Sequence, residues 1–378
     1  MNNAPAPTTS FTSPKYDDYF VNMGPQHPST HGVLRLVVKL AGETLLGMSP
    51  HMGYVHRGIE KMGEAQTAVQ FTHLTSRLDY LSAHMNNWGW AMAVEQACGI
   101  VVPERAEFIR LIMSELTRIS SHQLWWGVFG MDLGAFTPFL YGFRDREKVN
   151  DIFEKTCGQR LTMNYIVPGG VMEDVEENFV KDTREFCEYF KPLIEEYERL
   201  LSGNIIIQER TKGVGILPPD LAKAYGVTGP TLRASGVDYD VRKNHKYGVY
   251  DRLEWKTAVS DGCDSWARYK VRLEEMRQSL KIIEQALVMM PKEGPVRTKT
   301  PAVLRIPPGR YVSRCEAARG EIAFYLVGDG QPKPYRVKIR SAGFSNLSAL
   351  PHIAKGWRVA DIVTIMSTFD LVIPDIDR

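Results

Sequence analysis

Histidines and prolines alternate in the segment 24–32, GPQHPSTHG, where Pro25 and Pro28 stiffen a loop that carries His27 and His31. One chemistry open to this loop is metal binding, because further histidines follow nearby in the sequence. Pro28 disfavours a helical pair of ligands, however, and no acidic residue stands at a ligand-like spacing. The other hypotheses are structural, hydrogen-bonded histidines and, because the free imidazole pKa is about 6.5, proton transfer to a bound substrate.

A second candidate is the hexapeptide Arg77 to Ser82, RLDYLS, in which the phenol of Tyr80 follows the carboxylate of Asp79. A tyrosine hydroxyl can donate a proton or a hydrogen bond to a reacting oxygen. It can equally belong to a core tyrosine whose hydroxyl is satisfied within the protein. The residue types alone leave both hypotheses open.

Three further polar residues, Asp132, Arg57 and Arg77, are candidates for a functional site, but each could also have a purely structural role. Asp132, in the sequence GMDLG, could cap a helix that begins a few residues later. Arg57 and Arg77 could simply pair with their acidic neighbours in the sequence, Glu60 and Asp79.

Composition narrows the class of protein. The chain has 378 residues, 44% of them hydrophobic and 24% charged, and its net charge of +2 gives no field that would attract nucleic acid or an anionic membrane. Its five cysteines are scattered without a C-x-x-C spacing, which predicts neither a thiolate metal site nor a disulfide framework. No apolar run approaches the roughly 18 residues that span a bilayer. We therefore expect no nucleic-acid partner, and membrane contact only through other proteins.

The elements that must position these side chains follow from hydrophobic periodicity and turn residues. Residues 1–18, polar and rich in Pro, Thr and Ser, read as a disordered arm and not as a secretory signal. Residues 19–378 are expected to form one domain with a β-sheet part (19–55), a helical core (56–300) and C-terminal strands with a tail (301–378). The expected elements are a hairpin (33–40 with 44–48), two long helices (186–200, kinked at Pro192, and 269–287, ended by Pro291) and two strands (321–327 and 335–339).

Several blocks in order along the chain resemble the D subunit of respiratory complex I, NADH:quinone oxidoreductase, from about Gly24 to Arg378. They are GPQHPSTHGVLRL, GYVHRGIEKM, LTSRLDYLS, YIVPGGV, GVTGPTLRASGVDYDVRK, RLEEMRQSL and the terminal DIDR. The resemblance implies an α+β, predominantly α-helical fold similar to nickel-iron hydrogenase large subunits, with a small N-terminal β-sheet and C-terminal β-strands.

RLDYLS and the terminal segment 370–378 look like the two cysteine-pair motifs of such a hydrogenase with every thiolate replaced. Asp79 and Ser82 fall on the first pair of positions, and Val372 and Asp375 on the second. A nickel-iron centre needs soft thiolates, and valine cannot bind any metal. We therefore expect no metal in this chain and a redox cavity without one.

The resemblance also implies roles for individual residues. In the family, a histidine and a tyrosine hold the quinone head group, and they fall on His31 and Tyr80. An aspartate that pairs with the histidine falls on Asp132. The expected substrate is a quinone, either menaquinone or ubiquinone, and the chain is expected to be an oxidoreductase and translocase component that is active only within its complex.

Electrons would come from an iron-sulfur cluster in a partner, beside which the resemblance places Arg57 and Arg77. The expected partners are the cluster-bearing B subunit, the C subunit and the H subunit that forms the quinone channel in the membrane, with NAD, FMN and the clusters bound by other subunits. The expected location is the cytoplasmic face of the inner membrane, as a peripheral protein.

One position departs from the family pattern, because Thr162 stands where a histidine near the cluster is usual. Loss of that titrating group predicts a cluster potential with weak pH dependence and a low-potential quinone such as menaquinone; neutral drift is the competing explanation. Two alternatives remain for the whole chain: the equivalent component of a ferredoxin-dependent or hydrogenase-related membrane complex, and a non-catalytic scaffold.

Overall fold

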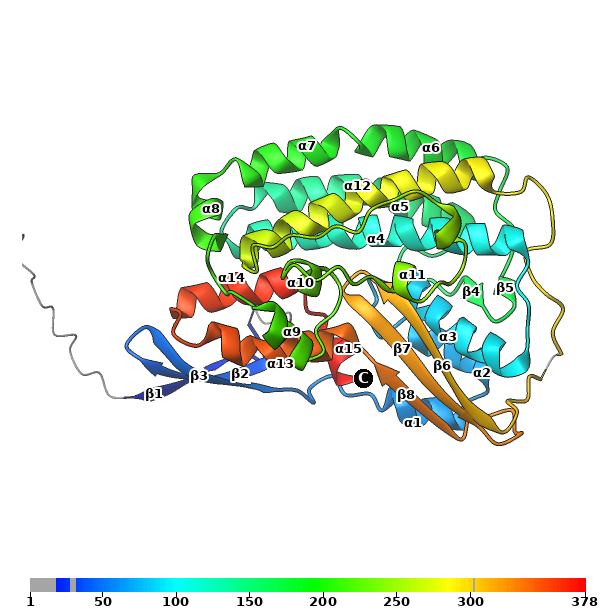
Figure 1. Cartoon of the computed structure of the whole chain (residues 1–378), viewed down its shortest axis with the longest axis horizontal. Helices are drawn as coiled ribbons and strands as arrows, with labels where there is room; N and C mark the ends of the chain where they lie inside the picture. Colours follow the sequence, from blue (N-terminus) through cyan, green and yellow to red (C-terminus); the bar gives the residue numbers. More distant parts are fainter. Residues whose placement is uncertain (1–17, 28–31, 302) are drawn as a thin grey trace, which may run out of the picture.

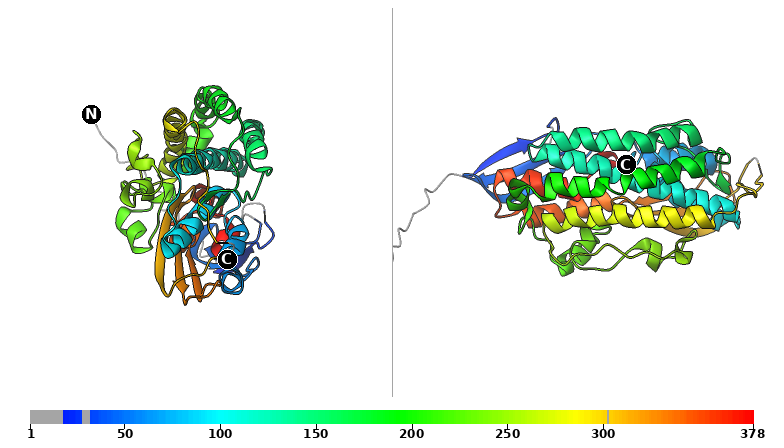
Figure 2. Two further views of the ribbon diagram at one scale, coloured as in Figure 1. Left: turned by 90° about the vertical axis from the view of Figure 1, so that its right-hand side faces the viewer. Right: turned by 90° about the horizontal axis from the view of Figure 1, so that it is seen from above.

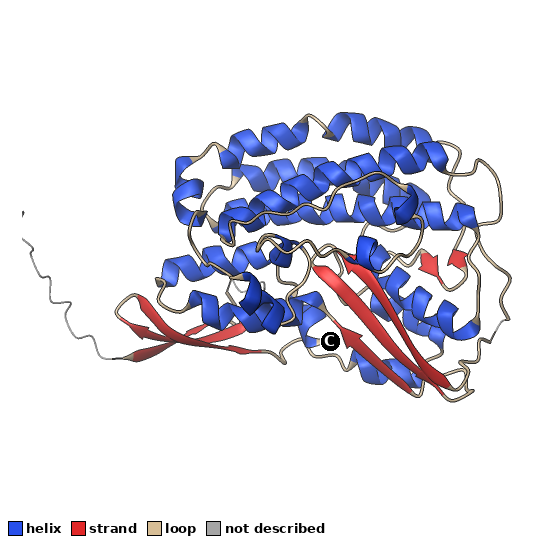
Figure 3. Ribbon diagram, viewed as in Figure 1, coloured by secondary structure: helices blue, strands red, loops and turns tan. Residues whose placement is uncertain are grey.

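The computed structural model describes residues 18–27, 32–301 and 303–378, and helices make up most of its regular structure (Figure 3). The long helices lie alongside one another in one layer, and two small sheets with shorter helices between them form the other layer (Figure 1). Seen from above, the long helices follow the longest axis of the molecule (Figure 2). The α+β, predominantly helical fold class is thus confirmed. Most of the expected arm, 1–17, lies outside the described residues.

The N-terminal sheet contains the expected hairpin, formed by β2 (Arg35–Ala41) and β3 (Thr44–His51) in antiparallel register. Leu36, Val38 and Leu40 alternate toward the core, as a half-buried strand requires. A third strand, β1 (Tyr19–Met23), pairs with the other edge of β2. The sequence pattern does not predict β1, because most of its side chains remain accessible to solvent and it lacks a clear apolar face.

Five helices follow the sheet: α1 (Ile59–Ala65), α2 (Ala68–Thr75), α3 (Ala83–Cys98), α4 (Glu104–Asp132) and α5 (Thr137–Cys157). Pro103 precedes α4, where its missing N–H costs no hydrogen bond. Helix α4 is buried along most of its length and packs against α5 and α12 (Ser265–Met289). It is therefore the central helix of the long-helix layer.

Of the two long helices predicted from apolar seams, one is continuous in the structure and the other is divided. Helix α12 ends just before Pro291, as predicted, and the Asp264 side chain caps its start by accepting a hydrogen bond from the Ala267 amide. The predicted helix 186–200 is not continuous. It is divided into α6 (Phe179–Phe190), α7 (Leu193–Tyr197) and a π-helical turn (Glu198–Ser202), because Pro192 cannot donate the backbone hydrogen bond that a continuous helix needs.

Two short strands, β4 (Ile166–Val167) and β5 (Gly170–Val171), lie between α5 and α6. The long connection from α7 to α12 contains only short elements: α8 (Ile205–Thr211), α9 (Pro219–Ala224), α10 (Pro230–Arg233), α11 (Val241–Asn244) and a 3-10 turn (Tyr250–Arg252). Buried ion pairs attach this connection to the long helices. Arg233 lies 2.5 Å from Glu275 of α12, and Arg242 lies 3.1 Å from Glu115 of α4.

The C-terminal part is more helical than expected. The predicted strands are present as β7 (Gly320–Gly328) and β8 (Arg336–Arg340), and β6 (Gly309–Ala317) adds a third antiparallel strand. The expectation of strands and a tail is wrong beyond β8, where α13 (Ala342–Ala354), α14 (Val359–Phe369) and α15 (Ile373–Asp377) form. On α14, Ile362, Ile365, Met366 and Phe369 recur at helical spacing and belong to the same hydrophobic core as the buried residues of the N-terminal sheet.

Three connecting segments meet between the two layers: the turn between β6 and β7, the loop between α2 and α3, and the segment after α14. Among the described residues, no helix is both long enough and apolar enough to cross a membrane.

Candidate functional site

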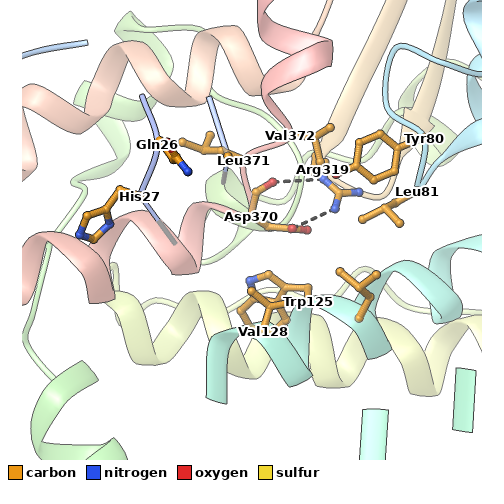
Figure 4. A pocket seen from close by; sticks show the side chains of 12 residues that line it. Gln26, His27, Tyr80, Leu81, Trp125, Val128, Arg319, Asp370, Leu371 and Val372 are labelled. Carbon is orange, nitrogen blue, oxygen red and sulfur yellow. Dashed lines mark hydrogen bonds and ion pairs between the residues drawn. The ribbon is translucent and has the colours of Figure 1, made fainter. Parts of the chain in front are cut away.

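A cavity of about 670 Å³ lies where the loop before α3, helix α4, the β6–β7 turn and the segment after α14 meet (Figure 4). Much of its wall is apolar, and Tyr80, Arg319 and Asp370 provide polar groups at one end. The remaining lining residues are Gln26, His27, Gly32, Leu81, Leu124, Trp125, Val128, Leu371 and Val372. An apolar cleft with a few convergent polar groups is the usual form of a small-molecule site.

Tyr80 lies in the turn between α2 and α3 and is 38% exposed, so the hypothesis of a core tyrosine is wrong. The neighbouring backbone is held firmly: the Asp79 carboxylate accepts a hydrogen bond from the Leu81 amide, and the Asn86 side chain donates to the Asp79 carbonyl. Partial burial raises the pKa of the Tyr80 phenol, and Arg319 opposes this rise. Tyr80 is thus a protonated donor at neutral pH beside a fixed positive charge.

Arg319 joins the two motif segments at the polar end of the cavity. Its Nη1 donates to the Asp79 carboxylate at 3.0 Å and to Ser121 Oγ at 2.8 Å. Its Nη2 donates to the Asp370 carboxylate at 2.9 Å, and its Nε to the Asp370 carbonyl at 3.1 Å. Burial opposes the charge of this guanidinium, but the Asp370 and Asp79 carboxylates outweigh burial and raise the pKa of Arg319. Arg319 is therefore a permanent cation.

A third carboxyl group, that of Asp375, lies buried close behind this pair. Burial, together with the negative charge of Asp79, raises the pKa of Asp375 to about 7. Asp79 and Asp375 occupy positions that the resemblance aligns with hydrogenase thiolates, and Arg319 neutralises Asp79. Hard carboxylates, one of them already bound to a guanidinium, do not fit a nickel-iron centre. Among the described residues, no group of three His, Cys, Asp or Glu side chains could hold a metal ion.

The histidine loop is only partly described. His31 lies outside the described residues, as do the other residues of 28–31. His27 and Gly32, which flank this stretch, both line the cavity. Asp132 is half-buried at the last position of α4 and does not cap α5, whose N-cap is Phe136, so the capping explanation is wrong. The roles predicted for His31 and Asp132 stay predictions.

Arg57 and Arg77 lie next to each other near the surface. Arg57 Nη2 donates to the Arg77 carbonyl at 2.8 Å. Neither arginine pairs with the acidic residue near it in the sequence. Glu60 instead forms ion pairs with Arg336, Lys338 and Arg378. Asp79 instead binds Arg319. Burial and the positive charge of Arg77 lower the pKa of Arg57.

Thr162 is linked to this region through hydrogen bonds. Its carbonyl accepts from Asn164 Nδ2 at 3.2 Å, Asn164 Oδ1 accepts from Ser76 Oγ at 3.0 Å, and Arg77 Nη1 donates to Ser76 Oγ at 3.2 Å. Thr162 has a backbone φ of 52°, a conformation that a β-branched residue rarely adopts.

The sequence reasoning missed Arg319 and assigned no role to Asp370. The available signal was an arginine in the tight turn EAARGE, directly before a predicted strand of apolar residues. A charged side chain at such a position needs a buried partner. Nothing local identifies the partner, because Asp79 and Arg319 are 240 residues apart in the sequence.

Known proteins that are similar to this chain have names of NADH dehydrogenase or NADH-quinone oxidoreductase subunits. The family model described as "Respiratory-chain NADH dehydrogenase, 49 Kd subunit" matches residues 132–305 and 297–378. A protein of Opitutus terrae named as the second D subunit of NADH-quinone oxidoreductase is 46% identical over 99% of this chain and 94% of its own length. The D subunit of the Clostridium beijerinckii enzyme is 46% identical over 96% of this chain and 98% of its own length.

A further relative, named as the C/D subunit of NADH-quinone oxidoreductase in Bacteroides thetaiotaomicron, is 49% identical over 96% of this chain and 68% of its own length. Together these matches cover nearly the whole sequence and confirm the resemblance found from the motifs. The chain belongs to the family of the 49 kDa, or D, subunits of respiratory-chain NADH dehydrogenase.

Proposed function

We propose that this chain forms the quinone-reduction cavity of a proton-translocating NADH:quinone oxidoreductase, beside the terminal iron-sulfur cluster of a partner protein. The observation that carries the proposal is the position of Tyr80, whose phenol is accessible at the polar end of a largely apolar cavity. A quinone has a flat apolar ring with carbonyl oxygens that accept hydrogen bonds. The apolar walls suit the ring, and the Tyr80 hydroxyl suits a carbonyl.

Reduction of a quinone to a quinol adds two electrons and two protons. In the proposed reaction, Tyr80 and His31 each supply one proton to a carbonyl oxygen, and solvent later restores both protons. Donors aimed at oxygens that gain negative charge stabilise that charge and also complete the chemistry. Asp132 would hold the His31 imidazole in its charged form, because a nearby carboxylate favours the protonated ring. The loss of the His31 proton would then change the net charge of that pair, the event that couples to proton translocation.

Electrons reach the cavity from the cluster of the B subunit, and Arg57 and Arg77 supply positive charge near it. The C subunit is a further partner, which the relative with the combined name C/D supports. The H subunit, in the membrane, would complete the quinone entrance, and NAD, FMN and the other clusters belong to further subunits. The chain would then be a peripheral protein on the cytoplasmic side of the inner membrane, held there by its partners.

A ferredoxin-dependent relative would use the same cavity with a different electron donor. The names of the relatives favour NADH over ferredoxin for this chain. A pure scaffold would not require an accessible phenol beside a buried cation, which favours a catalytic role.

The test is quinone reductase activity of the assembled complex with Tyr80→Phe and, separately, His31→Ala. We expect the partner's cluster to be reduced by NADH as in the wild type, while quinone turnover falls by about two orders of magnitude. Tyr189→Phe is the matched control, because it removes a hydroxyl bound to Asp145 and neither residue lines the cavity. Unchanged quinone turnover in both variants would favour the scaffold.

A further inference from the structure

Arg319 has hydrogen-bonding capacity beyond its ion pairs. A guanidinium carries five N–H donors, and in Arg319 Asp79, Ser121 and Asp370 accept four of them. The fifth, on Nη2, has no acceptor among the described residues. Arg319 is only 2% exposed, yet it lines the cavity beside Tyr80. The remaining donor is therefore available to a molecule in the cavity.

The surrounding charges hold this cation in place without making the site strongly positive. Arg319 lies between the Asp79 and Asp370 carboxylates, and Arg272 Nε lies 3.9 Å from the second Asp370 oxygen, which has no hydrogen-bond partner among the described residues. Burial lowers the pKa of Arg272 to about 10, which leaves it charged at neutral pH. These two arginines and two aspartates sum to zero charge. A neutral ligand can enter such a site, and an oxygen that becomes negative there meets a fixed donor.

We propose that Arg319 is an anion-stabilising residue of the cavity, which donates its remaining N–H to the ligand oxygen that gains negative charge next to Tyr80. This inference rests on the proposed quinone function and adds a residue to it. Two electrons come from the partner's iron-sulfur cluster, and the two protons come from Tyr80 and His31. Arg319 supplies neither: it keeps its protons throughout and interacts with the charged oxygen before the Tyr80 proton arrives.

The role of Asp79 and Asp370 follows from this arrangement. They fix the plane of the guanidinium so that no side-chain reorganisation is needed when charge develops. They also reduce the attraction of Arg319 for anions. Replacing Asp79 by Asn should therefore strengthen anion binding, whereas removing Arg319 should weaken it. If no ligand oxygen contacts Arg319, removing its charge together with that of Asp79 would leave anion binding almost unchanged.

The experiment compares two inhibitors of quinone turnover in the assembled complex: a hydroxynaphthoquinone that is ionised at neutral pH, and its neutral methyl ether. The measured quantity is the ratio of their inhibition constants. In Asp79→Asn we expect the preference for the anion to rise about tenfold. In the double variant Asp79→Asn with Arg319→Gln, which removes one charge of each sign, we expect the preference to fall about tenfold below the wild-type value.

The matched control is Arg105→Gln with Asp174→Asn, which removes an ion pair that does not line the cavity and should leave the ratio unchanged. An unchanged ratio in the double cavity variant overturns the role of Arg319. If that variant does not assemble, Asp79→Asn alone decides, because an unchanged or reduced preference overturns the inference. Failure of the neutral ether to compete with quinone in the wild type would instead contradict the proposed function.

Discussion

Arg57 donates a hydrogen bond to the backbone carbonyl of Arg77 across 2.8 Å, which brings two cationic residues, 20 positions apart in the sequence, to one surface. Like charges repel, and the pKa of Arg57 is lowered by burial and by Arg77. Such a pair is costly for an isolated chain and is stabilised when an electron-rich group binds beside it. This supports the proposed position of the partner's cluster.

Replacing Arg57 by Gln should make the cluster harder to reduce. One nearby charge worth about 1 kcal/mol corresponds to roughly 40 mV in a one-electron couple, so we expect the midpoint potential to become more negative by about that amount. A redox titration of the assembled complex, followed by electron paramagnetic resonance, measures the shift. Arg252→Gln, which removes an exposed ion pair with Glu104, is the control. Equal potentials in the two variants would place the cluster elsewhere.

Thr162→His should restore a pH-dependent potential to the same cluster. We expect the wild-type midpoint to change little between about pH 6 and pH 8, and the variant to show a clear slope, because an imidazole titrates in this range. The backbone at this position, with a φ of 52°, suits histidine better than threonine. A steep slope in the wild type would contradict the prediction that the missing histidine matters.

Asp132→Asn should lower quinone turnover without affecting reduction of the cluster. Loss of the carboxylate removes the charge proposed to keep His31 protonated, so we expect turnover at pH 7 to fall by about tenfold and its optimum to move to lower pH. The pH profile of quinone turnover measures both effects. Asp151→Asn, an exposed residue of α5 that pairs with Arg160, should keep the wild-type profile. A uniform loss at every pH would indicate a structural role for Asp132.

Asp375→Asn should stabilise the protein at neutral and higher pH. In the folded chain the Asp375 pKa is raised from 3.8 to about 7, so the folded state holds a proton that the unfolded state releases. The contribution of Asp375 to stability is full below about pH 4 and is lost as the pH rises to about 7, at a cost on the order of 4 kcal/mol. Denaturant unfolding of the purified chain at several pH values should show the variant gaining over the wild type across this window. Parallel pH curves would mean that Asp375 ionises normally.

The sequence predicted those elements whose apolar residues follow a clear period. The hairpin β2–β3, helix α12 and strands β7 and β8 all have such patterns. The edge strand β1 has almost no buried side chains and therefore no such pattern. The kink predicted at Pro192 is a full separation of α6 from α7, because proline lacks the backbone donor that a continuous helix needs. The expectation of a tail after β8 is wrong for α13 to α15, although the apolar residues of α14 recur at helical spacing and indicate a helix there.

By itself, the sequence determined the family, the mainly helical fold and the loss of metal-binding thiolates, because each of these depends on residue types and their local order. Only the tertiary structure decided that Tyr80 faces a cavity and that Arg319 joins Asp79 to Asp370. It also decided that Asp375 holds its proton near neutral pH. The physical reason is that burial and the distance between charges set these properties, and both arise from residues hundreds of positions apart.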